Sequence, residues 1–158
     1  RKMSEKEKMK DEVKVRSRVT AQLIDRKTGK VIQEETIANL ITDVGENMLC
    51  YWTKGDIVTK GYVTHMSLSD ETADPSETET TESGDHQGPR KTTVGTIDAS
   101  KITFTTTWNE DEANYTIRRA YLFTAASGGN LYATSKFATP FTKTSDYTFK
   151  VNWEITYA

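Results

Sequence analysis

Residues 147–157 read YTFKVNWEITY, and this stretch decides the fold. Its apolar and aromatic side chains occupy every second position, whereas threonine, lysine, asparagine and glutamate fill the positions between them. Successive side chains of a β-strand point to opposite faces, so strict alternation predicts a long strand with one buried face. The chain also contains 26 threonines, whose β-branched, hydroxyl-bearing side chains suit the solvated face of a sheet. This composition favours strands over helices.

Seven further segments carry strand signals. They are residues 13–23, 31–38, 62–69, 92–98, 101–108, 115–124 and 131–137. Turn-forming residues at 25–30 and 126–130 connect two pairs of these segments as hairpins. Residues 39–52 change to helical spacing, with Thr42 placed as the N-cap and Gly55 just beyond the end. The sequence therefore predicts an all-β sandwich of about eight strands, of jelly-roll or Greek-key type, with one short helix; a partly closed barrel is the alternative.

Two segments stand apart from the alternating pattern. Residues 70–88 hold seven acidic residues and no lysine or arginine, and Pro75, Gly84 and Gly88 interrupt regular structure. We expect a long, exposed and mobile loop within one sandwich domain that covers residues 13–158. Residues 1–12 are almost all charged or flexible and offer no apolar face, so we expect a flexible N-terminal arm.

The arm and the start of the first strand are locally basic. Residues 1–18 contain eight Lys or Arg against four Asp or Glu. Because these side chains cannot pack into a core but can pair with acidic groups of another protein, we predict that they bind a partner. The predicted partner-binding residues are Lys2, Lys6, Lys8, Lys10, Arg16 and Arg18.

Composition argues against several classes of partner. The formal net charge is −2, so no strong field favours nucleic acid or an anionic membrane surface. No apolar run approaches the roughly 20 residues of a membrane span. Cys50 is the only cysteine, which excludes a disulfide within the chain. We expect neither a nucleic-acid nor a membrane partner.

Signals for catalysis and for cofactors are weak. His65 and His86 are the only histidines, and neither lies in a nucleophile motif. Glu110 and Glu112 offer a pair of carboxylates, but their spacing alone does not create the pocket that raises one pKa. The acidic loop lacks the ordered ligand spacing of a calcium-binding loop. We therefore expect no enzymatic activity, no metal and no cofactor.

Aromatic residues raise one alternative from a different class. Aromatic rings on a surface groove stack on sugars, as in a carbohydrate-binding module. Trp108 and Trp153, however, continue the alternating apolar faces of their strands. Core packing is the favoured interpretation for both.

Several motifs, taken in order, resemble a family of tailed-bacteriophage virion proteins. They are Asn39 with Thr42 and Gly45, HMSLS at 65–69 before a Pro-containing acidic loop, ITFTTTW at 102–108, EANYTIRRAYLF at 112–123, SGG at 127–129, FATPFTK at 137–143 and VNWEIT at 151–156. The resemblance covers about residues 31–157. It implies a small β-sandwich that coats a capsid or sits in a tail or fibre, often as a trimer.

From this resemblance we expect a capsid decoration, or cement, protein that stabilises the shell through trimeric, non-covalent contacts. Its partners would be further copies of itself and the major capsid protein or other virion proteins. It would be made in the cytoplasm of a bacterial host and end in the virion. A tail, baseplate or fibre adaptor is the alternative within the same structural class.

Overall fold

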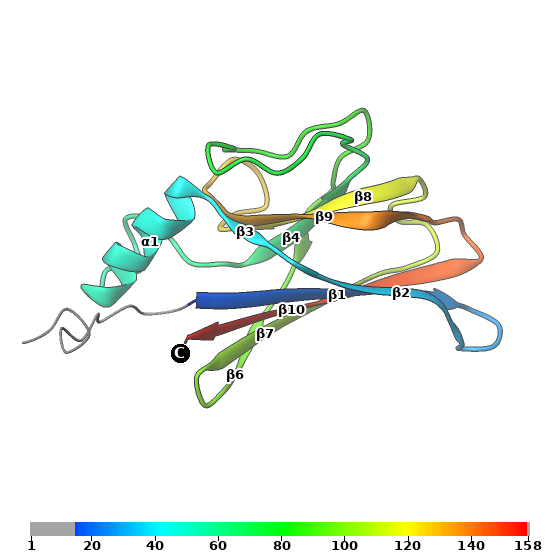
Figure 1. The fold of residues 1–158 in the computed structure, drawn as a ribbon, viewed down its shortest axis with the longest axis horizontal. Helices are drawn as coiled ribbons and strands as arrows, with labels where there is room; N and C mark the ends of the chain where they lie inside the picture. The colour runs from blue at the N-terminus through cyan, green and yellow to red at the C-terminus, as the bar shows by residue number, and fades with distance from the viewer. Residues whose placement is uncertain (1–14, 158) are drawn as a thin grey trace, which may run out of the picture.

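The computed structural model describes residues 15–157, which form two antiparallel five-stranded sheets packed as a sandwich (Figure 1). In spatial order, sheet A contains β2 (Val31–Ala38), β1 (Val15–Asp25), β10 (Tyr147–Tyr157), β7 (Lys101–Trp108) and β6 (Gly95–Asp98). Sheet B contains β3 (Leu40–Ile41), β9 (Leu131–Thr142), β8 (Thr116–Phe123), β4 (His65–Ser69) and β5 (Lys91–Thr92). With one short helix, α1 (Asp43–Thr53), the predicted all-β sandwich is confirmed.

The number of strands corrects the prediction, because ten form instead of eight. Two of them, β3 and β5, are only two residues long, which is too short for alternation to show. The segment predicted as one strand at residues 92–98 holds the end of β5 and all of β6, since the chain crosses there from sheet B to sheet A. Strand β9 also continues past its predicted end at residue 137.

The alternating stretch at the C-terminal end of the sequence forms the centre of sheet A. Strand β10 pairs with β1 on one side and β7 on the other. Its side chains Phe149, Val151, Trp153 and Ile155 are buried between the sheets, and Trp108 of β7 is buried beside them. The expectation that Trp108 and Trp153 belong to the core is confirmed. The even-numbered residues of β1 and β10 face away from this core, where the register places them in polar rows.

Helix α1 lies at one end of the sandwich (Figure 1). The hydroxyl oxygen of Thr42 accepts a hydrogen bond from the amide of Gly45 at 3.0 Å, so the predicted N-cap is confirmed. Gly45 is buried against β9, and a Cβ at this position would clash with the carbonyl oxygen of Tyr132. Glycine therefore allows the helix to approach the strand closely. Within residues 15–157, no helix is long and apolar enough to cross a membrane.

The acidic segment 70–88, which we call the acidic strap, lies over sheet B on the side away from sheet A (Figure 1). Tyr121, Phe123 and Leu131 are fully buried on this outer side and form a cluster separate from the main core. The Ser69 hydroxyl, just before the strap, lies 2.9 Å from the Tyr121 hydroxyl. Sheet B is thus covered on both faces, whereas sheet A presents its outer face to solvent.

Ion pairs fasten the acidic strap at three points. Each joins a strap carboxylate to a basic side chain of sheet B or its margin: Arg119–Glu79 at 2.7 Å, Lys136–Asp74 at 2.8 Å and Arg90–Glu82 at 2.8 Å. Many strap side chains are exposed, as predicted. The acidic composition of the segment alone does not reveal these three attachments.

Candidate interaction surface

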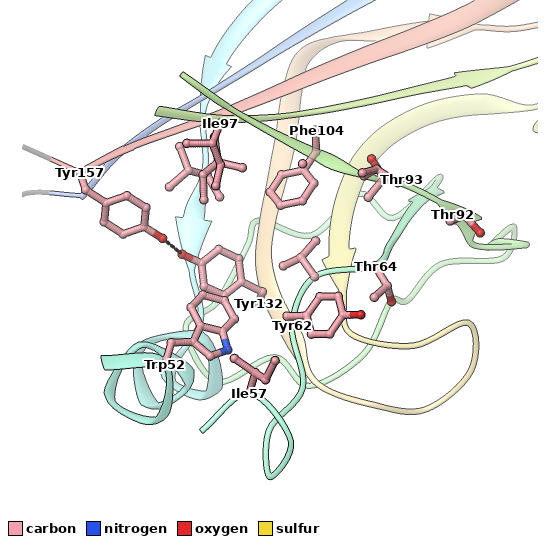
Figure 2. Close-up of a pocket in the computed structure, with 15 residues that line it drawn as sticks. Trp52, Ile57, Tyr62, Thr64, Thr92, Thr93, Ile97, Phe104, Tyr132 and Tyr157 are labelled. Atoms are coloured by element: carbon pink, nitrogen blue, oxygen red, sulfur yellow. Dashed lines mark hydrogen bonds between the residues drawn. The ribbon is translucent and has the colours of Figure 1, made fainter. Parts of the chain in front are cut away.

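The sandwich is open at the end where α1 and the last residues of β10 lie. A space of about 580 Å³ remains there between the two sheets, and we call it the hollow (Figure 2). Most of its lining is apolar or aromatic. Its main side chains are Trp52, Ile57, Tyr62, Phe104, Tyr132 and Tyr157.

The inner wall of the hollow combines residues from both sheets and from the helix. Phe104 of β7 and Tyr157 of β10 come from sheet A, Tyr132 comes from β9 of sheet B, and Trp52 comes from the last turn of α1. The rings of Trp52 and Tyr132 lie 5.4 Å apart between centroids. Because Gly45 allows helix α1 to pack closely against β9, Trp52 in the last turn of the helix lies at this wall.

The polar atoms of the wall already have partners. The indole nitrogen of Trp52 donates a hydrogen bond to the carbonyl oxygen of Gly61 at 2.7 Å. The hydroxyls of Tyr132 and Tyr157 lie 3.3 Å apart, as the dashed line in Figure 2 marks. Burial, together with this neighbouring hydroxyl, raises the pKa of Tyr132, so the phenol stays neutral. The wall is therefore an apolar surface with few free hydrogen-bonding groups.

Four of the side chains that line the hollow are large, apolar and exposed. These are Ile57, Tyr62, Val94 and Ile97, which we call the apolar rim; Val94 is 76% exposed and Ile97 73%. Within residues 15–157, the remaining exposed large apolar residues are Val58, next to Ile57 in the sequence, and Val31 and Ile32, in the β1–β2 hairpin. A contiguous apolar patch on a soluble domain usually marks an interaction site.

The edge of sheet A borders the hollow. Within residues 15–157, strand β6 pairs with β7 on one side only and ends the sheet. Ile97 of β6 pairs with Ile102 of β7, and both side chains line the hollow. Thr96 and Asp98 have the opposite parity and belong to the outer face of the sheet. An unpaired strand edge beside an apolar space offers both backbone hydrogen bonds and side-chain pockets to an added strand.

Of the six predicted partner-binding residues, the structure describes only Arg16 and Arg18, and both lie away from the hollow. Lys2, Lys6, Lys8 and Lys10 lie outside the described residues. Arg16 and Arg18 are exposed on the outer face of sheet A, where Arg18 forms a 2.7 Å ion pair with Glu154 of the neighbouring strand. Because the even-numbered side chains of β1 point away from the core, neither arginine reaches the space between the sheets.

The two histidines lie outside the hollow's inner wall. The Nδ1 atom of His65 is 2.8 Å from the hydroxyl of Thr64. The Nδ1 atom of His86 is 2.6 Å from a carboxylate oxygen of Asp70, and its ring stacks on Tyr115 with 5.3 Å between centroids. The His86 contacts hold the strap against its surroundings. Among residues 15–157, no group of three or more His, Cys, Asp or Glu side chains is placed to hold a metal ion.

A buried lysine lies away from the hollow. Lys143 is 2% exposed, and its ammonium donates hydrogen bonds to the Asn109 carbonyl at 2.7 Å and to the Asn114 side-chain oxygen at 2.8 Å. Burial lowers the pKa of Lys143, while the carboxylates of the 110–112 segment act in the opposite direction. These hydrogen bonds hold the loop between β7 and β8 in place.

The apolar rim is hard to find from the sequence. Val94 and Ile97 fall in a predicted strand, and Ile57 and Tyr62 fall in or near the connection after the helix. One signal does exist: residues 56–63 hold four large apolar side chains without a regular period. A loop normally exposes its side chains, so an apolar loop is a mark of an interaction surface.

Comparison of the chain with protein-family models, with curated proteins and with solved structures finds no match. The resemblance of residues 31–157 to phage virion proteins therefore has no support from a known relative. The hollow and its rim remain the structural basis for assigning a function.

Proposed function

We propose that this chain is a non-enzymatic assembly protein whose copies associate through the hollow and the apolar rim. The observation that carries the proposal is the exposure of four large apolar side chains that line an apolar space. Removing apolar surface from water contributes about 25 cal/mol per Å², so a second copy that covers this end gains stability. Among the described residues, the outer face of sheet A and the acidic strap offer no comparable patch.

The setting that we propose for this assembly is a phage virion, with the chain as a capsid decoration protein. Three copies that meet around a threefold axis would bury their rims together and present three equivalent surfaces to a shell. Three weak contacts made at once give much tighter attachment than one. The support for this setting is the order of the sequence motifs, together with the sandwich fold and a surface suited to self-association.

A tail, baseplate or fibre adaptor would use the same contacts, and only its place on the particle differs. Gold-labelled antibody and electron microscopy of virions separate the two roles. Label spread over the head supports decoration, and label confined to the tail supports an adaptor. Particles without label reject both.

The hollow does not favour a carbohydrate-binding module. A sugar needs hydrogen-bonding partners beside the aromatic ring on which it stacks. At the inner wall, the Trp52 nitrogen already donates a hydrogen bond to the backbone. The hydroxyls of Tyr132 and Tyr157 already bond to each other. The hollow is therefore better suited to an apolar side chain than to a sugar.

The test of self-association compares two isoleucines of equal exposure. Ile57 in the rim and Ile32 in the β1–β2 hairpin are each 55% exposed. Light scattering is expected to give a trimer for the unaltered chain and for Ile32→Glu, and a monomer for Ile57→Glu, because a charge in the rim has to be desolvated on association. A monomeric unaltered chain at all concentrations rejects the proposal, as does an Ile57→Glu variant that associates normally.

A further inference from the structure

We infer that the hollow of each copy receives the N-terminal segment, residues 1–14, of a neighbouring copy, which adds to the free edge of β6 as a short strand. This inference rests on the proposed self-association and names the group that fills the hollow. Three observations carry it: the place where the described chain begins, the length and composition of the preceding segment, and the parity of its side chains.

The described chain begins at the hollow. Val15, its first residue, pairs with Tyr157 of β10, and Tyr157 lines the hollow. Figure 1 shows the start of β1 at the same end of the sandwich as α1 and the C-terminal end of β10. Every copy therefore brings residues 1–14 to the end that carries its own apolar rim, and copies that meet at their rims bring these segments together.

The length and composition of the segment favour a neighbour over its own hollow. Fourteen residues at about 3.3 Å each reach up to about 45 Å when extended. Strand β6 lies three strand spacings from β1, or about 14 Å away at about 4.8 Å each. To pair with its own β6, the segment would have to cross the ends of β10 and β7 and then turn. Residues 1–14 contain no glycine or proline, the residues that most readily allow a tight turn.

If residues 1–14 are extended as a strand, their lysines all lie on one side of it. All five of its lysines stand at even positions: Lys2, Lys6, Lys8, Lys10 and Lys14. Its large apolar residues, Met3, Met9 and Val13, all stand at odd positions. The same parity operates in β1, where Val19, Ala21 and Leu23 are buried and Arg16 and Arg18 are exposed. An extended segment therefore presents methionine and valine, together with Glu5, Glu7 and Asp11, on one side and the five lysines on the other.

This parity matches the edge of β6. Ile97 faces the hollow, while Thr96 and Asp98 belong to the outer face of sheet A. A strand of four residues pairs with about four residues of a partner, and Lys8-Met9-Lys10-Asp11 fits this length. Met9 then lies opposite Ile97 and enters the hollow, and Lys8 and Lys10 lie on the outer face, where Asp98 is the register partner of Lys101 of β7. Methionine is unbranched and flexible, which suits a space of irregular shape. Asp11 has the parity of Met9 and lies opposite Gly95, at the end of the four paired residues.

Strand addition supplies both affinity and specificity. The backbone groups along the free edge of β6 gain hydrogen bonds, and the side chain that enters the hollow selects the partner. A segment passed from each copy to the next closes a ring if the rotation between copies is that of a threefold axis. This closure accounts for a trimer without any contact from the covered face of sheet B.

Disulfide formation between two differently marked chains tests the neighbour directly. Both chains carry Cys50→Ser, which removes the exposed natural thiol; one also carries Met9→Cys and the other Ile97→Cys. Mixing and mild oxidation are expected to give a mixed dimer well above the yield with Ile32→Cys, a matched exposed position in the far hairpin. Equal yields from both mixtures overturn the inference. A chain with both Met9→Cys and Ile97→Cys that closes only on itself, at every concentration, also overturns it.

A second measurement separates this inference from the proposed function. A chain that begins at Val15 keeps every described contact, so at dilutions where both chains are monomers its melting temperature is expected to equal that of the full chain, while its self-association weakens about tenfold or more. Met9→Lys should do the same, and Met9→Leu should associate normally. If the shortened chain associates like the full chain while Ile57→Glu does not, the hollow is still the contact between copies and the N-terminal segment does not fill it. If the full chain is a monomer, the proposed self-association fails first.

Discussion

Arg119 of β8 and Glu79 of the acidic strap form an ion pair between Nη2 and Oε2 at 2.7 Å, although 40 residues separate them in sequence. A second bond joins Nη1 to Oε1 at 3.0 Å, and the Arg119 side chain is only 1% exposed. A buried guanidinium requires an opposite charge, because isolated charges are costly to remove from water. The strap thus supplies the counter-charge that allows an arginine on the covered face of sheet B.

Removal of this counter-charge is the first prediction. Glu79→Ala leaves Arg119 buried without a partner and is expected to lower the free energy of unfolding by about 3 kcal/mol. The measurement is equilibrium unfolding in urea. Asp74→Ala is the control within the strap, since Asp74 is 89% exposed and its pair with Lys136 is solvated; its unfolding midpoint should not change. Adding Arg119→Met to Glu79→Ala should recover part of the loss, and a further loss would show that Glu79 is not the partner that matters.

Acid is expected to weaken the same part of the fold. Burial alone raises the pKa of the Glu82 carboxyl, but the hydrogen bonds from Arg90, from its own backbone amide and from Thr81 outweigh burial and hold the pKa below its ordinary value of 4.5. A carboxyl with a lowered pKa in the folded state stabilises the protein above its ordinary pKa, and this contribution disappears as the pH falls through the lowered value. Melting temperatures are therefore expected to hold above pH 4.5 and to drop below it.

The contribution of Glu82 to the loss of stability in acid can be measured by comparing the unaltered chain with a variant at Arg90. Arg90→Gln removes the charged partner of Glu82 and should lower the melting temperature at neutral pH while making the decline in acid shallower. Carboxyls paired with other cations, such as Glu112 with Lys91, keep their own contribution in both proteins. Parallel curves for the two proteins would contradict the role given to Arg90.

Gly45 should tolerate no side chain, in contrast to the usual rule for helices. In most helices Gly→Ala is stabilising by about 1 kcal/mol. At this position the new Cβ meets the Tyr132 carbonyl oxygen and the Ile41 side chain. We expect Gly45→Ala to destabilise the fold by about 2 kcal/mol through overpacking. Asn47→Ala, at an exposed position of the same helix, is the control and should be neutral or slightly stabilising; thermal unfolding measures both.

The last strand should carry a large share of core stability. Phe149 is fully buried and packs edge-on against Phe141, with 5.0 Å between ring centroids. Phe149→Ala is expected to cost about 3 to 5 kcal/mol, and Trp153→Ala a similar amount, since each leaves a cavity in the core. Thr148→Ala, one position away on the other face, should cost far less. A melting temperature for Phe149→Ala equal to that of the unaltered chain would mean that this face is not the core.

Alternation in the sequence is sufficient to identify the long strands. Residues 147–157 show it plainly, and the buried positions of β10 are those that the pattern indicates. The helix and its Thr42 cap are also predictable, because capping is a local property of a few neighbouring residues. Strands β3 and β5 are not, since two residues carry no period and are held by pairing with distant strands.

The hollow is beyond what alternation can reveal. Parity tells which side chains point between the sheets, but not where the two sheets separate. Ile97 has the parity of a core residue and is nevertheless 73% exposed, because β6 is the last strand of sheet A at the open end of the sandwich. Arg119 gives the reverse case: a charged residue in a strand suggests a solvated face, and only the strap, folded back over sheet B, buries it.

The turn of the β1–β2 hairpin lies at the end of the sandwich opposite the hollow. This turn follows Asp25, which pairs with Tyr147, whereas the hollow lies at the Tyr157 end of the same strand. The Asp25 carboxylate accepts hydrogen bonds from the amides of Lys27 and Thr28, and Gly29 has a positive φ of 70°, so the turn is shaped by its own few residues. A peptide or a fluorescent protein inserted at Thr28 would leave the sheets and the rim untouched. In the assembly that we propose, copies joined at their hollows would display that cargo outward, one per chain, so this turn is a suitable attachment point for a label.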